Sequence, residues 1–228
     1  NITYITPSGG TEDAGGLFPI IENAKIGIYK DPLIIENLTL NSSLSSSGII
    51  GHAKNSEIMI IAKNAIHTAT VGNYIGGIVG RVEDHIRLES SSFQGTIDAS
   101  NSNAVGGLIG GTGNADIYIE ESSAKLDLLK GTTTQTTGYG VGGLMGSALS
   151  ANSIKVENSY VWIDINGDKN GVNNDIEGPL DSTAALIGDA NDVPIEIKNS
   201  YADIKNATVN GTNFTNNEDY NLLPMLLQ

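Results

Sequence analysis

Hydrophobic and polar residues alternate in short segments that recur along the chain. Each segment has aliphatic residues at its first and third positions, and five copies lie at residues 58–60, 86–88, 117–119, 154–156 and 195–197. Because successive side chains of a strand point to opposite faces, such alternation predicts strands with one buried face. Helical periodicity is nearly absent, so the pattern predicts an all-β chain.

A glycine-flanked apolar tetrapeptide precedes the alternating segments. It occurs at residues 48–51, 77–80, 107–110 and 143–146, and in a weaker form at 185–188. A polar corner follows each of the later segments, and then comes a second alternating strand. A unit of about thirty residues cannot bury an apolar face by itself, so neighbouring units must stack. The sequence therefore predicts a parallel β-helix (β-solenoid) of about six coils with three short strands per coil.

The repeats also set the expected organisation of the chain. Residues 33–205 are predicted to form the β-helix repeats, residues 1–32 an N-terminal cap and first partial coil, and residues 206–228 a C-terminal cap or tail. Caps hide the strand edges and apolar interior that open coils expose. The residues expected to cover the two ends are Leu17, Phe18, Ile20, Ile21, Leu222, Leu223, Met225, Leu226 and Leu227. One interior ladder is predicted from equivalent repeat positions, formed by Ile60, Leu88, Ile119, Val156 and Ile197.

Composition narrows the chemistry that the chain can perform. The 228 residues include no cysteine, which excludes disulfide bridges, a thiolate nucleophile and cysteine-based zinc sites. The formal net charge of −14 makes nucleic acid and anionic membranes poor partners. No apolar run approaches the eighteen residues that suggest a membrane-spanning helix, so no membrane insertion is expected.

The repeats resemble a known family. Gly-Leu-Ile-Gly at 107–110 and Gly-Leu-Met-Gly at 143–146, with Asn-Ser-Tyr at 158–160, are similar to GLUG-motif repeats, and the similarity covers roughly residues 14–205. Such repeats occur in bacterial adhesins, in filamentous-haemagglutinin-like surface proteins and in non-catalytic regions of immunoglobulin A peptidases. The resemblance implies a β-helix in a larger bacterial chain located outside the cell or on its surface. It brings no catalytic residues with it.

The units lengthen along the chain because residues are added at one place. The alternating strands begin at residues 33, 58, 86, 117, 154 and 195, so the interval grows from 25 to 41 residues. The additions lie between the second strand and the next tetrapeptide, at 131–140 and 166–183, which places them on one edge of the solenoid. Inserts on one face of a solenoid often form its binding face. Long polar loops are also tolerated without any function.

Aromatic residues near these inserts are candidates for a carbohydrate-binding surface. They are Tyr139, Tyr160 and Trp162, the last being the single tryptophan of the chain. If Ile163 points into the core, Trp162 points outward and shares a face with Tyr160. An exposed tryptophan beside the inserts indicates a binding site. The alternative is that the long insert covers Trp162 as a small satellite cluster.

One insert contains a candidate calcium loop. Residues 166–177 fit the twelve-residue calcium-loop template except that asparagine replaces aspartate at the first position. The predicted ligands are Asn166, Asp168, Asn170, the carbonyl oxygen of Val172 and Glu177. The alternative is a solvated loop rich in Asn, Asp and Gly without any metal, since no helices are expected to hold an EF-hand geometry.

A catalytic function has less support in the sequence. Arg81, His85 and Arg87 form a small basic spot, but such residues more often pair with nearby carboxylates such as Glu83 and Glu89. No zinc-protease, nucleophile-elbow, Walker or Rossmann motif occurs. We therefore expect a non-catalytic adhesin-like domain that binds a glycan or a host or surface protein through its enlarged loops. The alternatives are a polysaccharide lyase or hydrolase on a β-helix and the passive stalk of a larger secreted protease.

Overall fold

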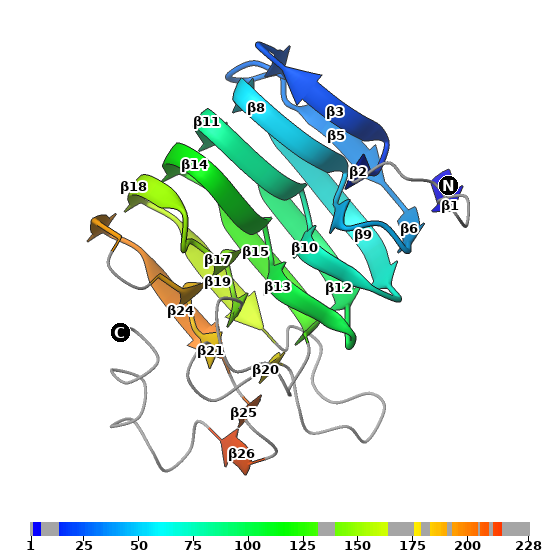
Figure 1. Cartoon of the computed structure of the whole chain (residues 1–228), viewed down its shortest axis with the longest axis vertical. Helices are drawn as coiled ribbons and strands as arrows, with labels where there is room; N and C mark the ends of the chain where they lie inside the picture. Colours follow the sequence, from blue (N-terminus) through cyan, green and yellow to red (C-terminus); the bar gives the residue numbers. More distant parts are fainter. Residues whose placement is uncertain are drawn as a thin grey trace.

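The computed structural model describes residues 2–5, 14–131, 140–163, 176–178, 183–190, 193–204, 206–209 and 212–215. In these residues the chain is all-β without a helix, and its strands form three sheets around a common hydrophobic core (Figure 1). Among the described strands, β25 (Asn206–Val209) and β26 (Thr212–Thr215) form the one antiparallel pair. No described segment forms a helix that could cross a membrane. The parallel sheets agree with the expected all-β fold and are consistent with a β-helix.

Neighbouring strands in each sheet come from successive repeats of the sequence. The six-stranded sheet contains β2 (Ala14–Gly15), β7 (Ser46–Ser47), β10 (Gly72–Gly76), β13 (Ser102–Gly106), β16 (Val141–Gly142) and β21 (Thr183–Ala184). The nine-stranded sheet contains β3 (Phe18–Glu22), β4 (Lys25–Ile26), β8 (Ile50–Ile58), β11 (Val79–Glu89), β14 (Ile109–Glu120), β17 (Met145–Ser147), β18 (Ala151–Glu157), β22 (Ile187–Asp189) and β23 (Ile195–Lys198). The eleven-stranded sheet contains β25 and β26 together with β1 (Ile2–Ile5), β5 (Leu33–Glu36), β6 (Leu38–Ser42), β9 (Ile60–Ala69), β12 (Ser92–Asp98), β15 (Ser123–Lys130), β19 (Tyr160–Ile163), β20 (Ile176–Gly178) and β24 (Tyr201–Ile204).

The two larger sheets are interrupted by irregular register within their long strands. The register shifts between Glu83 and Ile86 where β11 pairs with β8, and between Phe93 and Gly95 where β12 pairs with β9. As a result, β5 and β6 pair with different halves of β9, and β19 and β20 pair with different halves of β15. Because such bulges bend a strand, the outer surface of each long strand is divided into two facets.

The glycine-flanked tetrapeptides form the most regular part of the core. Five of their apolar residues lie in register on neighbouring strands and are buried, namely Ile50, Val79, Ile109, Met145 and Ile187. The flanking glycine is required by close backbone approach. An added Cβ at Gly110 would lie 2.4 Å from the backbone nitrogen of Ile75, and one at Gly146 would lie 2.4 Å from that of Val105. Any larger residue would push two neighbouring strands apart.

The predicted interior ladder is correct at three of its five positions. Leu88, Ile119 and Val156 are buried in register on β11, β14 and β18. The partner of Leu88 on β8 is Ile58, whereas Ile60 begins β9 in the eleven-stranded sheet. The corner after Ile58 contains fewer residues than its counterpart after Leu88, and its apolar residues imitate strand alternation. Ile197 pairs with Val156 but is 42 % exposed.

A ladder of serines closes the corner that follows these strands. Ser91, Ser122 and Ser159 are buried, and each hydroxyl donates to the backbone carbonyl two residues earlier. Each hydroxyl oxygen also accepts a backbone N–H bond from the preceding repeat. The three bonds run from Ile60 to Ser91 at 3.0 Å, from Ser91 to Ser122 at 3.1 Å and from Ser122 to Ser159 at 3.1 Å. The corner is thus held by side chains as well as by backbone pairing.

At the N-terminal end, the apolar residues expected to cover the first rung lie in β3 or directly before it. Phe18 and Ile21 lie in β3 and, with Leu17, pack against the core. Ile20 points outward and is 59 % exposed, so the expectation that it covers the first rung is wrong. Its neighbour Pro19 is exposed as well, whereas Ile21 on the other side packs against the core. The apolar residues predicted to cover the other end, between 222 and 227, lie outside the described residues.

Candidate functional site

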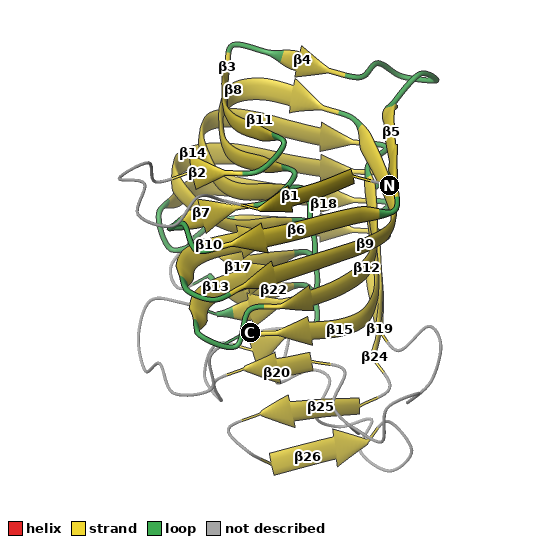
Figure 2. Ribbon diagram, turned by 90° about the vertical axis from the view of Figure 1, so that its right-hand side faces the viewer, coloured by secondary structure: helices red, strands yellow, loops and turns green. Residues whose placement is uncertain are grey.

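Two outward-facing rows of side chains run along one facet of the eleven-stranded sheet. This facet is built from β5, β9, β12, β15, β19 and β24, which follow one another down the right-hand side of Figure 2. Backbone pairing fixes the first row, which we call the axial row, as Ile34, Ile61, Ser92, Ser123, Tyr160 and Tyr201. Beside it, a second row over the last four strands consists of Gln94, Lys125, Trp162 and Asp203.

Three aromatic residues gather where these rows cross β19 and β24. Val161 and Ile163 are buried, so Tyr160 and Trp162 point to the outer face of β19. Trp162 is 43 % exposed, and Tyr201 on the neighbouring strand is 60 % exposed. The rings of Tyr160 and Tyr201 stack with centroids 5.5 Å apart and planes 10° apart. We call Tyr160, Trp162 and Tyr201 the aromatic platform.

Charged groups flank the aromatic platform on both sides. Lys125 and Asp203 are the register partners of Trp162 on β15 and β24. The Lys125 Nζ atom lies 5.4 Å from the centroid of the Tyr160 ring, within the range of a cation–π contact. Burial acts to raise the pKa of Tyr160, but hydrogen bonds to Lys125 and Ser123 outweigh it and lower the pKa. The platform therefore combines apolar ring surface with a cation and a carboxylate.

The prediction that Trp162 points outward beside Tyr160 is confirmed, since both lie on the outer face and Trp162 remains exposed. Tyr139, the third aromatic residue predicted from the sequence, lies outside the described residues. Tyr201 was missed, although the sequence contained a signal for it. Asn-Ser-Tyr occurs at 158–160 and again at 199–201, so the repeat that gives Tyr160 also gives Tyr201.

The candidate calcium loop falls mostly on residues that the structure does not describe. Asn166, Asp168, Asn170 and Val172 all lie outside the described residues. The backbone of Glu177 belongs to β20, where it pairs with Lys130 on β15. Among the described residues, no three histidine, aspartate or glutamate side chains gather to hold a metal ion. The calcium site remains a prediction from the sequence.

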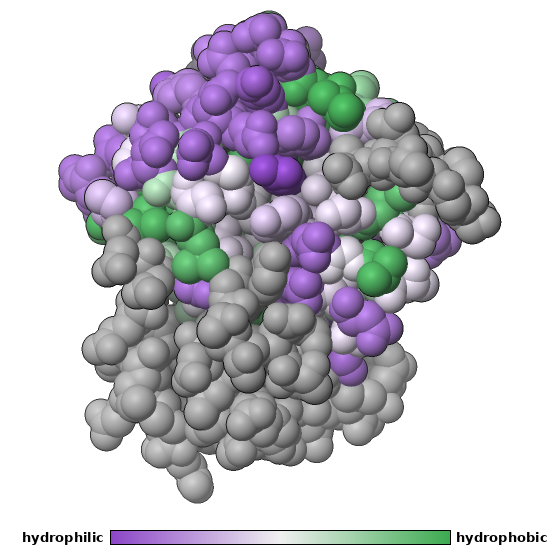
Figure 3. All heavy atoms as spheres, viewed as in Figure 1, coloured by the Kyte–Doolittle hydropathy of each residue, from purple (hydrophilic) through white to green (hydrophobic). Residues whose placement is uncertain are grey.

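The basic spot expected from the sequence lies on β11 of the nine-stranded sheet, and both of its arginines form ion pairs. Arg81 forms an ion pair with Glu83 at 2.7 Å, and Arg87 binds Glu89 at 2.9 Å and Glu120 at 2.8 Å. These pairs agree with the ordinary interpretation, in which the arginines balance carboxylates on a solvated face. Figure 3 shows hydrophilic side chains over much of the face that carries β3, β8 and β11.

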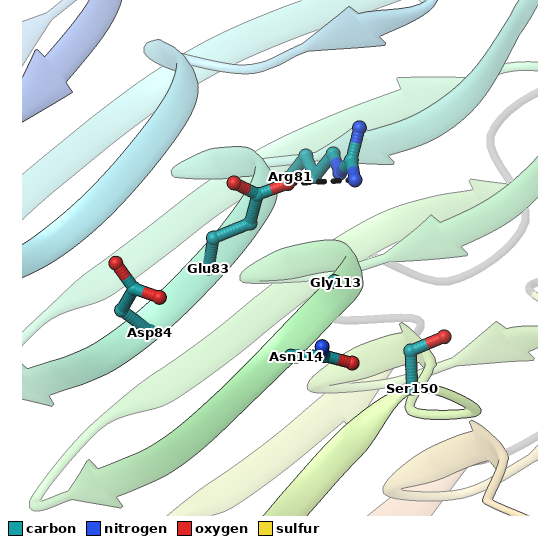
Figure 4. Close-up of a pocket in the computed structure, with 6 residues that line it drawn as sticks. All are labelled: Arg81, Glu83, Asp84, Gly113, Asn114 and Ser150. Carbon is teal, nitrogen blue, oxygen red and sulfur yellow. Dashed lines mark ion pairs between the residues drawn. The ribbon is translucent and has the colours of Figure 1, made fainter.

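A shallow hollow lies beside this spot. It has a volume of about 350 Å³ and is lined by Arg81, Glu83, Asp84, Gly113, Asn114 and Ser150 (Figure 4). In Figure 4 the Arg81 guanidinium reaches Glu83, while the Asp84 side chain lies apart from both. Asp84 is itself 3.7 Å from Lys54. Both carboxylates that line the hollow, those of Glu83 and Asp84, thus already have cationic partners. The hollow lacks the converging acids that glycoside cleavage uses.

Ser47 and His67 form a close pair inside the molecule. The Nδ1–H of His67 donates to the carbonyl oxygen of Gly76 at 3.1 Å, which leaves Nε2 to accept the Ser47 hydroxyl at 2.6 Å. A serine beside a histidine base is typical of an activated nucleophile. Here both side chains are buried within the core, so no substrate reaches them. Desolvation lowers the pKa of His67 to about 4, although the bond to Gly76 opposes it.

No protein-family model, curated protein or solved structure matches the chain. Function is therefore inferred from the surfaces described above. The charged face of the nine-stranded sheet is balanced by ion pairs, and the Ser47–His67 pair is closed to solvent. The aromatic platform differs from both because it presents large apolar rings to solvent with polar groups beside them.

Proposed function

We propose that this chain is a non-catalytic carbohydrate-binding module of a bacterial surface or secreted protein, built on a β-solenoid of about six coils. The observation that carries the proposal is the aromatic platform, in which Trp162 and Tyr201 lie exposed on adjacent, in-register strands. Kinship with GLUG-motif repeats, and a place in a larger adhesin-like chain, belong to the same proposal. They rest on the repeats within residues 14–205.

Aromatic rings suit sugars because one face of a pyranose ring carries mainly C–H groups. Those groups pack on an aromatic ring and bury apolar surface. The hydroxyl groups at the sugar edge need polar partners, which Lys125 and Asp203 supply on either side of Trp162. Binding sites of this type combine apolar surface with a few fixed polar groups that set orientation. The platform meets both requirements.

Charge favours a neutral glycan over an anionic one. The formal charge of −14 repels polyanions over the whole surface, and Lys125 is a single cation beside the carboxylate of Asp203. Two inserted segments, 131–140 and 166–183, follow β15 and β19 in the chain, which are the strands that carry Lys125 and Trp162. This adjacency supports the view that the enlarged loops belong to the same binding region.

A glycan array followed by calorimetric titration tests the proposal. The Trp162→Ala variant is expected to bind at least about tenfold more weakly than the unmodified protein, a loss of about 1.4 kcal/mol. Tyr118→Ala is the matched control, because Tyr118 is an exposed aromatic residue on β14 of the nine-stranded sheet. Its affinity should be unchanged. Binding that survives Trp162→Ala, or binding to no neutral glycan at all, would show that the platform is not a carbohydrate site.

A further inference from the structure

The axial row extends well beyond the aromatic platform. It crosses six strands in continuous register, from Ile34 on β5 to Tyr201 on β24. Five steps of about 4.8 Å between parallel strands give a length of about 24 Å. A single sugar ring covers only a small part of such a row. The surface therefore offers more contact than the platform alone.

The side chains along the row change character from one end to the other. Ser92 and Ser123 occupy its middle, where Ser92 is half-buried and Ser123 is buried, and Gln94 and Lys125 lie beside them in the second row. At the far end Ile34 is 55 % exposed. The axial row thus has an exposed aliphatic residue at one end, small polar residues at its centre and aromatic residues at the other end.

From this arrangement we infer that the ligand is a linear, neutral polysaccharide that lies along the axial row, perpendicular to the strands. This inference rests on the proposed function. A β-1,4-linked chain of glucose-type units is a flat ribbon because its linkages are equatorial, and it presents C–H faces and hydroxyl edges at regular intervals. Such a ribbon can follow a facet on which paired strands repeat at a regular spacing. Its hydroxyl edge would meet Gln94 and Lys125, and its sugar faces would pack on the platform at one end and Ile34 at the other.

The test uses cello-oligosaccharides and chito-oligosaccharides from the disaccharide to the hexasaccharide. Affinity is expected to rise with each added unit, at least about tenfold in total, because each unit gains contact with a further strand. Ile34→Asp should weaken binding of the hexasaccharide several-fold and leave the disaccharide unchanged, since the short ligand stays on the platform. Ile20→Asp is the matched control, because Ile20 is exposed to a similar extent on β3 of the nine-stranded sheet.

The outcomes separate this inference from the proposed function. If the hexasaccharide binds no tighter than the disaccharide, the ligand does not lie along the axial row. The same follows if Ile34→Asp has no effect on the hexasaccharide while Trp162→Ala still removes binding. In both cases the proposed function of the aromatic platform is unaffected. If Trp162→Ala leaves every chain length unaffected, the platform itself is not the site. Thermal melting of each variant checks its folding, and Ile34→Asp is expected to melt close to the unmodified protein because Ile34 faces outward.

Discussion

His67 occupies an interior position because a bulge changes which residues of β9 face the core. Ala62 and Ala65 are both buried although they are three residues apart, and Asn64 between them has a φ of 51°. After this irregularity Ile66 points to solvent and His67 points inward. Apolar character alone would place Ile66 inside. The sequence therefore allows Trp162 to be placed correctly, because β19 alternates without interruption, but it does not allow His67 to be placed.

The buried imidazole makes stability depend on pH. The folded protein holds the pKa of His67 at about 4, below the ordinary value of 6.5, so the unfolded chain binds a proton first as pH falls. Stability from this group is complete above pH 6.5 and is lost as pH decreases toward 4. Each pH unit costs up to about 1.36 kcal/mol, so the loss reaches about 3 kcal/mol. Denaturant unfolding at a series of pH values measures it.

His67→Gln supplies the comparison for this prediction. Glutamine keeps a donor for Gly76 and an acceptor for Ser47 but does not titrate, so the variant should show a smaller decrease of unfolding free energy between pH 6.5 and 4. The carboxylates contribute equally to the pH dependence of the unfolding free energy in the variant and in the unmodified protein. If the variant is too unstable to measure, NMR titration of the His67 ring in the unmodified protein decides the question. An imidazole that titrates near 6.5 contradicts the argument.

At the scale of elements, the corner after each alternating strand is held by side chains. The residue before each serine of the ladder adopts a left-handed backbone, with φ of 46° at Ser90, 48° at Glu121 and 50° at Asn158. This conformation costs free energy in residues other than glycine. The serine hydroxyls offset that cost because they satisfy backbone groups that the turn removes from the sheet.

Ser122→Ala should weaken this corner. The variant leaves the buried N–H of Ser91 without the acceptor that lies 3.1 Å away in the unmodified protein. An unsatisfied buried donor costs about 1–3 kcal/mol, so the unfolding free energy should decrease by that amount. Ser100→Ala is the control, because the Ser100 hydroxyl binds a partly exposed side chain, Asp98, and should change stability by less than about 0.5 kcal/mol. Equal effects of the two substitutions would exclude a special role for the ladder.

Elements were predictable from the sequence where the repeat is strict. The tetrapeptide at 107–110 begins ten residues before its alternating strand, compared with nine and eleven residues in the two neighbouring repeats, and Ile109 lies in register with Val79 and Met145 as expected. The prediction that residues 58–60 form one strand was wrong, because this segment lacks the polar residues found at 89–91. Its short turn therefore looked like another alternating strand. Alternation identifies a strand, but the length of a corner decides where the next strand begins.

At the scale of the whole molecule, stacking converts a weak sequence signal into a continuous surface. Tyr160 and Tyr201 are forty-one residues apart in the chain, yet pairing of β19 with β24 places them side by side. From the sequence, the inserted loops are the expected contact region. The described facet that carries Trp162 arises instead from register between strands, which the positions of single residues do not reveal.

Stacking also leaves an edge that must not recruit another strand. In the described residues β3 is the terminal strand of the nine-stranded sheet, paired on one side with β8. The N–H of Phe18 donates to Ile49 at 3.0 Å, so by alternation the next backbone nitrogen, that of Pro19, faces the free edge. Proline has no N–H to offer there. Pro19 thus removes a donor from an edge that is otherwise suited to strand addition.

Pro19→Val should therefore promote self-association. Valine restores the edge donor and favours extended backbone, so two molecules can pair through their β3 edges. Sedimentation velocity over a concentration series is expected to show dimers or larger species that the unmodified protein does not form at the same concentrations. Pro19→Lys restores the same donor but adds a charge that opposes edge pairing, so it should behave like the unmodified protein. If Pro19→Val sediments like Pro19→Lys at every concentration, the free edge of β3 is protected by something other than proline.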